Sequence, residues 1–311
     1  VRPEPPPPPP ARAQVAPPPA RAAAAPRAPT IVINDTLKSA TEVKYSDLYC
    51  SGFVTTEPIP HNLKVIARFD ATGAVLAGEA DYIYLSQGSE DGIQTGNTYD
   101  VVRPTKTLVN PYGRTTASRD LGMHYLDVAQ IKVVLTQADF SLARVMVTCA
   151  DAVEVGDVLM PFHQVAFPQP PRPRPFSPTM MVNGGASGVI VAAKSILLNF
   201  GSTFHMSGAT PGVRTNDRLG AVERGIAEVG SIVYIDIGQD QSVKPGDVFV
   251  AYRHIDFDQR LFPAPPETQK LKNVRTAVGE VVVVRVGERA STALVTYAVD
   301  ALMLGDEVER R

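Results

Sequence analysis

The sequence predicts a mainly β protein built from two tandem small β-barrel or sandwich modules with few short helices. Three observations predict this fold: an internal repeat, short apolar strands separated by glycine turns, and two proline-rich tracts. The repeat begins at Tyr84, and residues 84–103 return as residues 234–253, 150 residues later. A repeat of this length indicates two copies of one β module, and a duplicated scaffold points toward binding or assembly.

The N-terminal tract, residues 1–30, is almost entirely Pro, Ala and Arg. Such a composition cannot form a core and favours an extended polyproline helix, which at ~3.1 Å per residue reaches on the order of 90 Å. The tract is therefore either a disordered leader or an extended strap or spacer, and we favour the second. Because the chain starts at Val1 and not at Met, we expect a processed form; a removed secretory signal or an upstream lipid anchor stays open.

The repeat and the second proline-rich tract divide the chain into modules. We expect module 1 at 31–162, a Pro-rich linker at 163–178 that holds the modules apart, and module 2 at 179–311. In module 2 the apolar runs 281–286 and 292–297 flank a short turn, as in a β hairpin. The first copy repeats this pattern around residues 137–140. Helical periodicity is scarce, and the candidate helices are 34–45 and 217–229.

The most regular signal is a glycine followed by Asp or Asn just before an apolar strand. Glycine accepts the positive φ of a tight turn, and Asp or Asn can bond its own downstream backbone there. We interpret these positions as turns that set strand register, and not as ligands. The predicted structural turn residues are Gly88, Gly96, Asn97, Gly156, Asp157, Gly238, Gly246, Asp247, Gly305 and Asp306.

The loops 104–120 and 254–276 occupy the same place in the two copies. Matching Gly122 to Gly279 implies about seven extra residues in the second loop. Long loops on a repeated scaffold commonly carry partner contacts, although tolerated insertions explain them equally well. The predicted partner-binding residues are Tyr112, Arg114, Phe257 and Phe262.

The chain has two cysteines, Cys50 and Cys149, both in module 1. A disulfide between them would close a loop of about 100 residues and stabilise the fold by roughly 4–5 kcal/mol in the chain-entropy model. The alternative is two separate buried thiols. Neither cysteine has a neighbouring His or a Cys-x-x-Cys partner, so we expect no metal or redox role.

Composition excludes several function classes. The formal net charge is −2, which provides no basic stripe for nucleic acid. No apolar run approaches the ~18–20 residues of a membrane-spanning helix. The five histidines are scattered without metal-binding spacing, and the Gly-rich run 184–188 lacks both the nucleophile-elbow and the phosphate-loop patterns. We therefore predict no catalytic residues, no cofactor and no metal, and expect a protein that is not an enzyme.

The repeated pattern resembles the C-terminal β modules of bacterial cell-envelope proteins, such as LysM-containing periplasmic proteins and the T protein of the flagellar outer rings. The resemblance covers about 81–162 and 231–311. The chain contains no LysM repeat, and two copies flanked by Pro-rich tracts differ from the flagellar arrangement. The matching residues are Tyr84, Gly88, Gly96, Asn97, Arg103, Gly122, Gly156 and Asp157, and in the second copy Tyr234, Gly238, Gly246, Asp247, Arg253, Gly279, Gly305 and Asp306.

The resemblance implies an exported protein of the periplasm or outer membrane. Our leading hypothesis is a non-enzymatic scaffold that binds or bridges other envelope proteins, or further copies of itself, through strand edges and the two loops. The alternative is a module that binds cell-wall glycan through Tyr82, Tyr84, Tyr234 and Tyr252. A hydrolase with a site between the modules is the third hypothesis. The identity of the partner assembly stays open.

Overall fold

The computed structural model describes residues 43–69, 75–111, 119–149, 151–165, 185–195, 197, 227–254, 265–271 and 274–311. Lys38–Arg311 form one compact unit, which contains all the described residues of both modules. The tract 1–30, most of the linker 163–178 and most of the candidate helices 34–45 and 217–229 lie outside the described residues. The strap and spacer roles therefore stay predictions.

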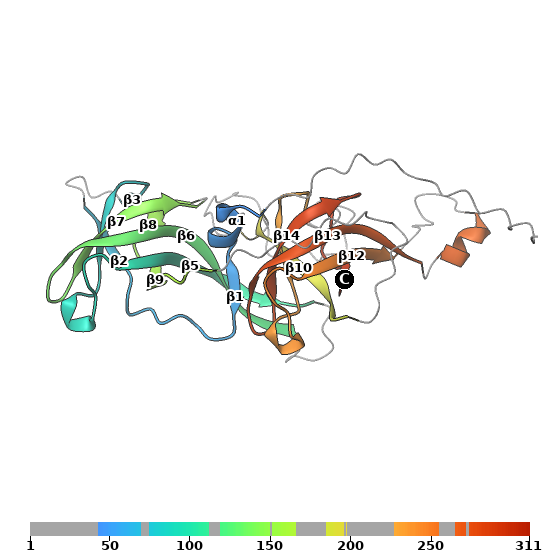
Figure 1. Cartoon of the computed structure of the whole chain (residues 1–311), viewed down its shortest axis with the longest axis horizontal. Helices are drawn as coiled ribbons and strands as arrows, with labels where there is room; N and C mark the ends of the chain where they lie inside the picture. Colours follow the sequence, from blue (N-terminus) through green and yellow to red (C-terminus); the bar gives the residue numbers. More distant parts are fainter. Residues whose placement is uncertain are drawn as a thin grey trace, which may run out of the picture. The chain divides into compact units, whose positions relative to one another are not determined.

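The prediction of a mainly β fold is confirmed, and Figure 1 shows the strands of both modules. In the first module, a short helix α1 begins after Lys44, whose backbone N–H donates to the Asp47 carboxylate at 2.7 Å. The elements of this module are α1 (Tyr45–Tyr49), β1 (Phe53–Thr55), β2 (Val65–Arg68), β3 (Leu76–Ala77), β4 (Tyr82–Leu85), η1 (Ser89–Asp91), β5 (Thr98–Val109), β6 (Asp120–Thr136), β7 (Ser141–Thr148), β8 (Val153–Glu154) and β9 (Val158–Pro161).

Strands of the first module follow the order β2-β4-β7-β6-β5-β9, and β1 pairs with the far part of β6. An isolated bridge from Lys64 to Val158 joins the first strand of this order to the last. Apolar side chains from alternate positions, such as Ile83, Leu85 and Ile131, fill the interior. The first module is thus a six-stranded barrel that a short bridge closes.

The second module repeats this order as a closed barrel, β10-β11-β14-β13-β12-β15. Its six strands leave no edge free, so the expected use of strand edges for binding is wrong for this barrel. Its elements are β10 (Ser187–Ala193), β11 (Ile232–Ile235), η2 (Gln239–Gln241), β12 (Val248–His254), η3 (Pro266–Leu271), β13 (Arg275–Val286), β14 (Ser291–Ala298) and β15 (Glu307–Arg310).

Strand register corrects one detail of the predicted repeat. Val101 pairs with Ala129 in the first barrel, and Ala251 pairs with Gly279 in the second. Gly279 therefore corresponds to Ala129 and not to Gly122, and the offset stays at 150 residues through both hairpins. The extra residues of the second copy lie instead between β10 and β11. The error arose because a glycine was matched to a glycine without a strand register to fix the alignment.

Part of the predicted loop 104–120 is strand. Residues 104–109 belong to β5, and the hairpin is paired as far as Val109 and Asp120. In the second copy, β12 ends at His254 and β13 begins at Arg275.

The glycine turns have the predicted conformation at four positions. Gly96, Gly156, Gly246 and Gly305 have φ values between 91° and 99°. The acidic side chains that follow bond to upstream and not to downstream backbone: the Asp247 carboxylate accepts the Lys244 N–H at 3.0 Å.

Each barrel also contains one repeated ion pair. Arg103 donates two hydrogen bonds to the Asp157 carboxylate, at 2.7 and 2.9 Å. Arg253 does the same to Asp306, at 2.8 Å for both bonds. Bidentate pairs of this kind are strong and directional, so they hold the turn before the last strand against the β5 or β12 strand. The repeated Arg and Asp of the sequence are therefore structural partners.

The two barrels are in contact, and the expectation that the linker holds them apart is wrong. One buried apolar cluster contains Leu48 and Val54 of the first module together with Tyr234, Val284 and Leu294 of the second. The burial of this apolar surface outweighs whatever separation a stiff linker favours.

Candidate interaction surfaces

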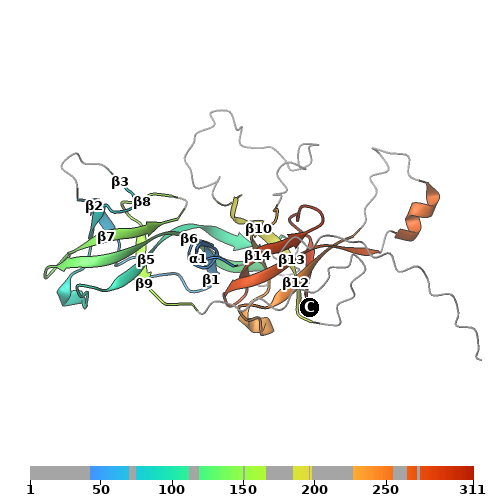
Figure 2. The same cartoon turned by 45° about the horizontal axis from the view of Figure 1, so that its top comes forward.

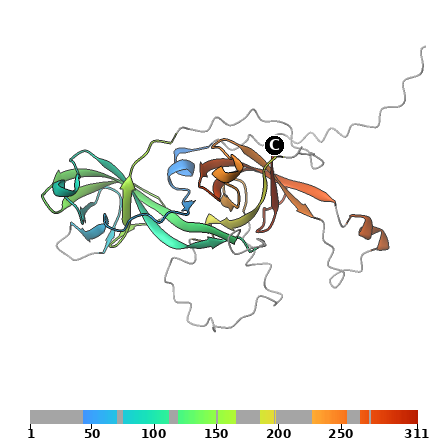
Figure 3. The ribbon, with the colours of Figure 1, turned by 90° about the horizontal axis from the view of Figure 1, so that it is seen from below.

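The junction between the barrels is formed by three elements of the first module: α1, β1 and the far end of the β5–β6 hairpin. Figures 1 and 3 show these elements beside β10, β13 and β14. They cover one outward side of the second barrel, which we call the closed face. The closed face consists of Val191, Ala192, Ile232, Tyr234, Val284, Ala290, Thr292 and Leu294. All of these side chains are buried.

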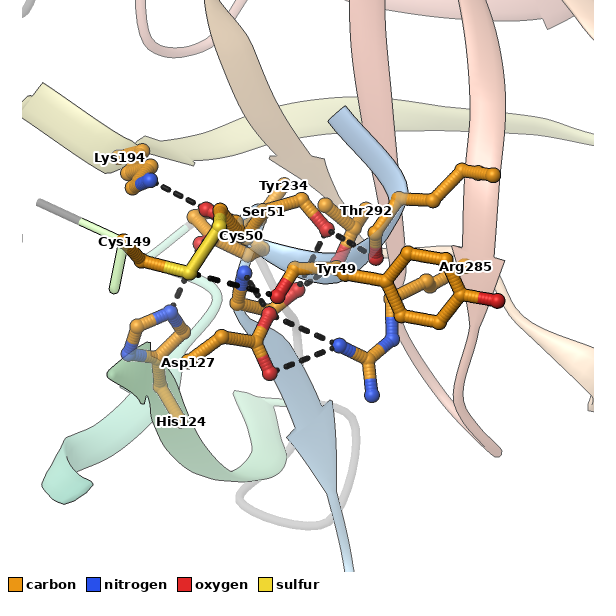
Figure 4. A network of polar contacts seen from close by, with 12 residues as sticks. Tyr49, Cys50, Ser51, His124, Asp127, Cys149, Lys194, Tyr234, Arg285 and Thr292 are labelled. Atoms are coloured by element: carbon orange, nitrogen blue, oxygen red, sulfur yellow. Dashed lines mark hydrogen bonds and ion pairs between the residues drawn. A yellow bond between two sulfur atoms is a disulfide. The ribbon is translucent and has the colours of Figure 1, made fainter. Parts of the chain in front are cut away.

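A disulfide fixes the segment that enters the junction. Cys50 and Cys149, which the sequence left open as a disulfide or two thiols, are joined, with their Cα atoms 5.4 Å apart. The Lys194 ammonium, just after β10, donates to the Cys50 carbonyl. Figure 4 shows this contact beside the disulfide. The disulfide therefore links the connection between α1 and β1, which lies in the junction, to the end of β7 in the first barrel.

Gly52 lies at a close approach of the two barrels. Its φ is +74°, and a Cβ there would lie 2.7 Å from the Tyr234 hydroxyl and 2.9 Å from His124 Nε2. Its carbonyl accepts a hydrogen bond from Thr292 at 3.0 Å. Its N–H donates to the Asp127 carboxylate at 2.7 Å. Both the backbone conformation and the space require glycine at this position.

Asp127 and Arg285 form an ion pair across the junction. Arg285 Nη1 lies 2.9 Å from each Asp127 carboxylate oxygen, and Asp127 is only 5% exposed. The Arg285 guanidinium also stacks on the Phe53 ring, 4.2 Å from its centre. Figure 4 shows the two charged groups pointing toward each other. A buried charge with its partner removed is costly, so this pair specifies how the barrels meet.

His124 and Tyr234 form another polar contact across the junction, with Nε2 and Oη 2.8 Å apart. The Tyr234 hydroxyl donates to the Ser51 carbonyl at 2.7 Å, so it accepts from the Nε2–H of His124. Burial, together with the charges of Lys106 and Lys194, lowers the pKa of His124 to about 3. Burial likewise raises the pKa of Tyr234. Both groups are therefore neutral at physiological pH and act as hydrogen-bonding partners.

The first barrel carries an apolar surface at the equivalent place, and there it is open. We call it the open face; its outward side chains are Ile66, Ala67, Phe69, Tyr82, Tyr84, Val134, Phe140, Leu142 and the charged Arg144. Ile66, Tyr82 and Val134 are 43%, 39% and 40% exposed. The open face lies on β2, β4, β7 and the end of β6, of which β2, β6 and β7 are labelled in Figure 2.

Aromatic rings form a continuous group on the open face. The Phe69 ring centre lies 6.3 Å from that of Tyr82 and 5.9 Å from that of Tyr84. Tyr84 in turn lies 5.9 Å from Phe140. Exposed contiguous apolar side chains of this kind mark binding surfaces more often than single exposed residues do. The open face is therefore the candidate interaction surface.

The predicted partner-binding residues Tyr112, Arg114, Phe257 and Phe262 lie outside the described residues, so their role stays a prediction. Of the four tyrosines considered for glycan binding, Tyr82 and Tyr84 belong to the open face. Tyr234 and Tyr252 are 0% and 4% exposed, which removes them from a glycan-binding surface.

The structure separates the described histidines. His124 lies in the junction, His163 contacts the Pro161 carbonyl, and His254 lies 3.4 Å from Glu307. Within the part of the chain that the structure describes, no three His, Cys, Asp or Glu side chains are placed to hold a metal. The hydrolase hypothesis placed its catalytic site between the two modules. The described residues at that place form the buried apolar cluster and the polar pairs of the junction.

Among the described residues, no helix combines the length and apolar character needed to cross a membrane. No protein-family model matches the chain, and no curated protein matches it at a significant level.

Sequence reasoning missed the junction because the local pattern does not distinguish the two copies. The strand 232–235 is a run of four apolar or aromatic residues, and all four are buried. Its counterpart 82–85 is also a run of four such residues, but there exposed and buried residues alternate.

Proposed function

We propose that the chain is a non-enzymatic, exported bacterial envelope protein. Its duplicated β barrels form a scaffold that binds or bridges components of a larger periplasmic or outer-membrane assembly. The observation that carries the proposal is the contrast between the two faces. The closed face is filled by the chain itself, whereas the open face presents Tyr82 and Val134 to solvent.

Two further observations support the proposal. The Cys50–Cys149 disulfide fits an oxidising compartment, where such bonds persist. The resemblance of the repeated module to envelope β modules favours the same location. The junction, with its disulfide and its buried Asp127–Arg285 pair, provides the fixed geometry that a bridging protein needs.

The test is site-specific crosslinking in native envelopes. A photo-crosslinking amino acid replaces Tyr82 on the open face, and a matched variant carries it at the exposed Lys244 on the second barrel. We expect position 82, and not position 244, to capture one defined set of proteins by mass spectrometry. Equal, unspecific capture at both positions, with the protein free in the soluble fraction, would overturn the proposal.

A second candidate function is glycan binding, and the aromatic group of the open face favours it. Outward rings such as Phe69, Tyr82 and Tyr84 can stack on the apolar faces of sugars. Under this function the protein sediments with purified cell wall, and Tyr82→Ala weakens sedimentation whereas Lys244→Ala does not. Absence of wild-type co-sedimentation would remove this candidate and leave protein binding.

A further inference from the structure

We propose that the open face is complementary to itself and binds the open face of a second copy of this chain around a two-fold axis. Three features of the described residues carry this inference: an apolar centre, two cations at one end of the face, and two carboxylates at the other end. The inference rests on the proposed scaffold function and names a partner for the open face.

The centre of the open face is apolar and exposed. Tyr84 pairs with Leu142 in the sheet register, and the Phe140 ring lies 5.9 Å from that of Tyr84. The neighbouring Ile66 and Val134 are 43% and 40% exposed. Aromatic and aliphatic side chains form the buried core of protein interfaces, where charged residues are depleted. The centre of the face is therefore suited to packing against another apolar surface.

Two cations stand at one end of this centre. Lys132 pairs with Arg144 in the sheet register, and Arg144 pairs with Tyr82, so the three side chains form one row on the outer surface. Both cations are exposed, and within the described part of the chain neither forms an ion pair or a side-chain hydrogen bond. Like charges directly opposite each other destabilise a sheet, so a carboxylate from a partner would relieve this repulsion.

The second barrel shows that the fold does not require these cations. Val282 pairs with Leu294 there as Lys132 pairs with Arg144 in the first barrel. Val282 and Leu294 are 4% and 0% exposed. The charged pair is therefore specific to the barrel whose outward face the chain leaves uncovered.

Two carboxylates stand at the opposite end of the face. Asp139 is exposed in the turn between β6 and β7, directly before Phe140. Glu90 is also exposed and lies beside the same turn, because its backbone N–H donates to the Ala138 carbonyl at 3.1 Å. Among the described residues, neither carboxylate forms an ion pair. The second barrel has Arg289 at the position of Asp139, so this end also differs in charge between the two barrels.

The order of these groups along β7 makes the face complementary to itself. Phe140 just before β7, and Leu142 and Arg144 within it, occupy alternate positions, so Phe140 and Arg144 lie ~7 Å from Leu142 on opposite sides. A two-fold axis in the plane of the contact, perpendicular to β7 at Leu142, sets the β7 strands of two copies antiparallel. Arg144 of each copy then faces the partner's Phe140 and Asp139, and the apolar centres meet.

The resulting contact is isologous, since both copies use the same surface. The association between a cation end and a carboxylate end occurs twice, which fixes the relative orientation of the two copies. An isologous contact closes at a dimer, because neither copy keeps a free open face. The dimer presents two second barrels, as a protein that bridges components of an assembly requires.

The test is a charge exchange, followed by sedimentation and native mass spectrometry of the full chain. Arg144→Glu and Asp139→Arg each bring like charges together at both symmetric contacts; both residues are exposed, so both variants should fold. We expect the wild type to dimerise with rising concentration, and each variant alone to dimerise roughly tenfold more weakly. An equimolar mixture of the two variants should form heterodimers as strong as the wild-type dimer, because each contact again joins a cation to a carboxylate. Lys244→Glu, at an exposed cation of the second barrel, is the matched control and should dimerise as the wild type does.

The proposal is overturned if the wild type stays monomeric up to about 1 mM or associates beyond a dimer. It is also overturned if either variant dimerises as the wild type does, or if mixing the variants restores nothing. Failure of this partner is distinguishable from failure of the scaffold function. A crosslinker at Tyr82 that captures other proteins in native envelopes, and not a second copy of the chain, would reject the two-fold contact and leave the scaffold function standing.

Discussion

The two barrels have the same strand order and the same repeated Arg–Asp pair, yet one outward face is closed in one and open in the other. In the second barrel, Tyr234 is buried and donates to Ser51. Its counterpart Tyr84 is half-buried among other rings on an uncovered surface. The two copies therefore share the barrel, and their outward side chains determine whether a face is covered by its own chain or left exposed.

The largest expected effect comes from the disulfide, which anchors the junction segment only to the first barrel. Replacing both Cys50 and Cys149 by Ser should lower the free energy of unfolding by roughly 4 kcal/mol, because the bond closes a long loop. Urea unfolding measures this change. The Arg253–Asp306 ion pair of the second barrel lies outside the loop that this disulfide closes. Equal stability of the double variant and the wild type would show that the bond contributes nothing to the junction.

The buried ion pair gives the next effect. Asp127→Ala leaves Arg285 without its carboxylate and should destabilise the protein by about 3 kcal/mol. The double variant Asp127→Ala with Arg285→Leu installs the residues found at the equivalent positions 277 and 135. It should recover part of that loss. Recovery is incomplete because the Gly52 N–H also loses its acceptor. A double variant that is as unstable as the sum of the two single variants would contradict the account.

Gly52→Ala tests the close approach. The positive φ and the clash with Tyr234 and His124 together should cost about 2–3 kcal/mol. Gly92→Ala is the matched control, since Gly92 has a φ of +88° but open space around it. That control should cost only about 1 kcal/mol. Thermal unfolding of both variants separates backbone strain from contact between the barrels, and equal losses would argue against the junction.

The smallest effect concerns Asp100, which stands where the second barrel has the buried Val250. Burial, together with the charge of Asp127, raises the pKa of Asp100 from 3.8 to about 6. Because the folded pKa is the higher one, the fold favours the protonated acid. The ionised Asp100 carboxylate therefore destabilises the fold. This loss of stability is absent below about pH 3.8 and complete above about pH 6.

Asp100→Asn should therefore stabilise the protein by about 2 kcal/mol at pH 7.5 and by almost nothing at pH 3.5. Urea unfolding at the two pH values checks the sign. A gain that does not change with pH would refute the assignment of the penalty to a buried carboxylate.

Much of the fold could be predicted because it depends on local patterns. Apolar strand-length runs and glycine turns such as Gly96 and Gly246 recur in both copies, and their backbone conformations follow from residue type. The prediction that the proline-rich linker holds the modules apart was wrong, because the stiffness of a linker does not determine the contacts that the modules make elsewhere. The alignment through Gly122 failed because only strand pairing fixes register.

The candidate surface was harder to predict. Tyr82 and Tyr84 were singled out as aromatic residues, but alternation alone does not say whether an outward ring is covered. Tyr234 has the same local pattern and is buried by residues more than 100 positions earlier, such as His124. Tyr84 and Tyr234 differ only in whether a distant segment of the chain docks over the ring. The residues next to each tyrosine in the sequence do not predict that docking.

The most direct test of the central claim is oxidative footprinting of tyrosines, in the dilute purified protein and in native envelopes. We expect Tyr82 to react in the purified protein and to become protected in the envelope. Tyr234 stays protected in both, because its own chain covers it. Equal reactivity of Tyr82 in the two preparations would contradict the claim that the open face is a binding surface.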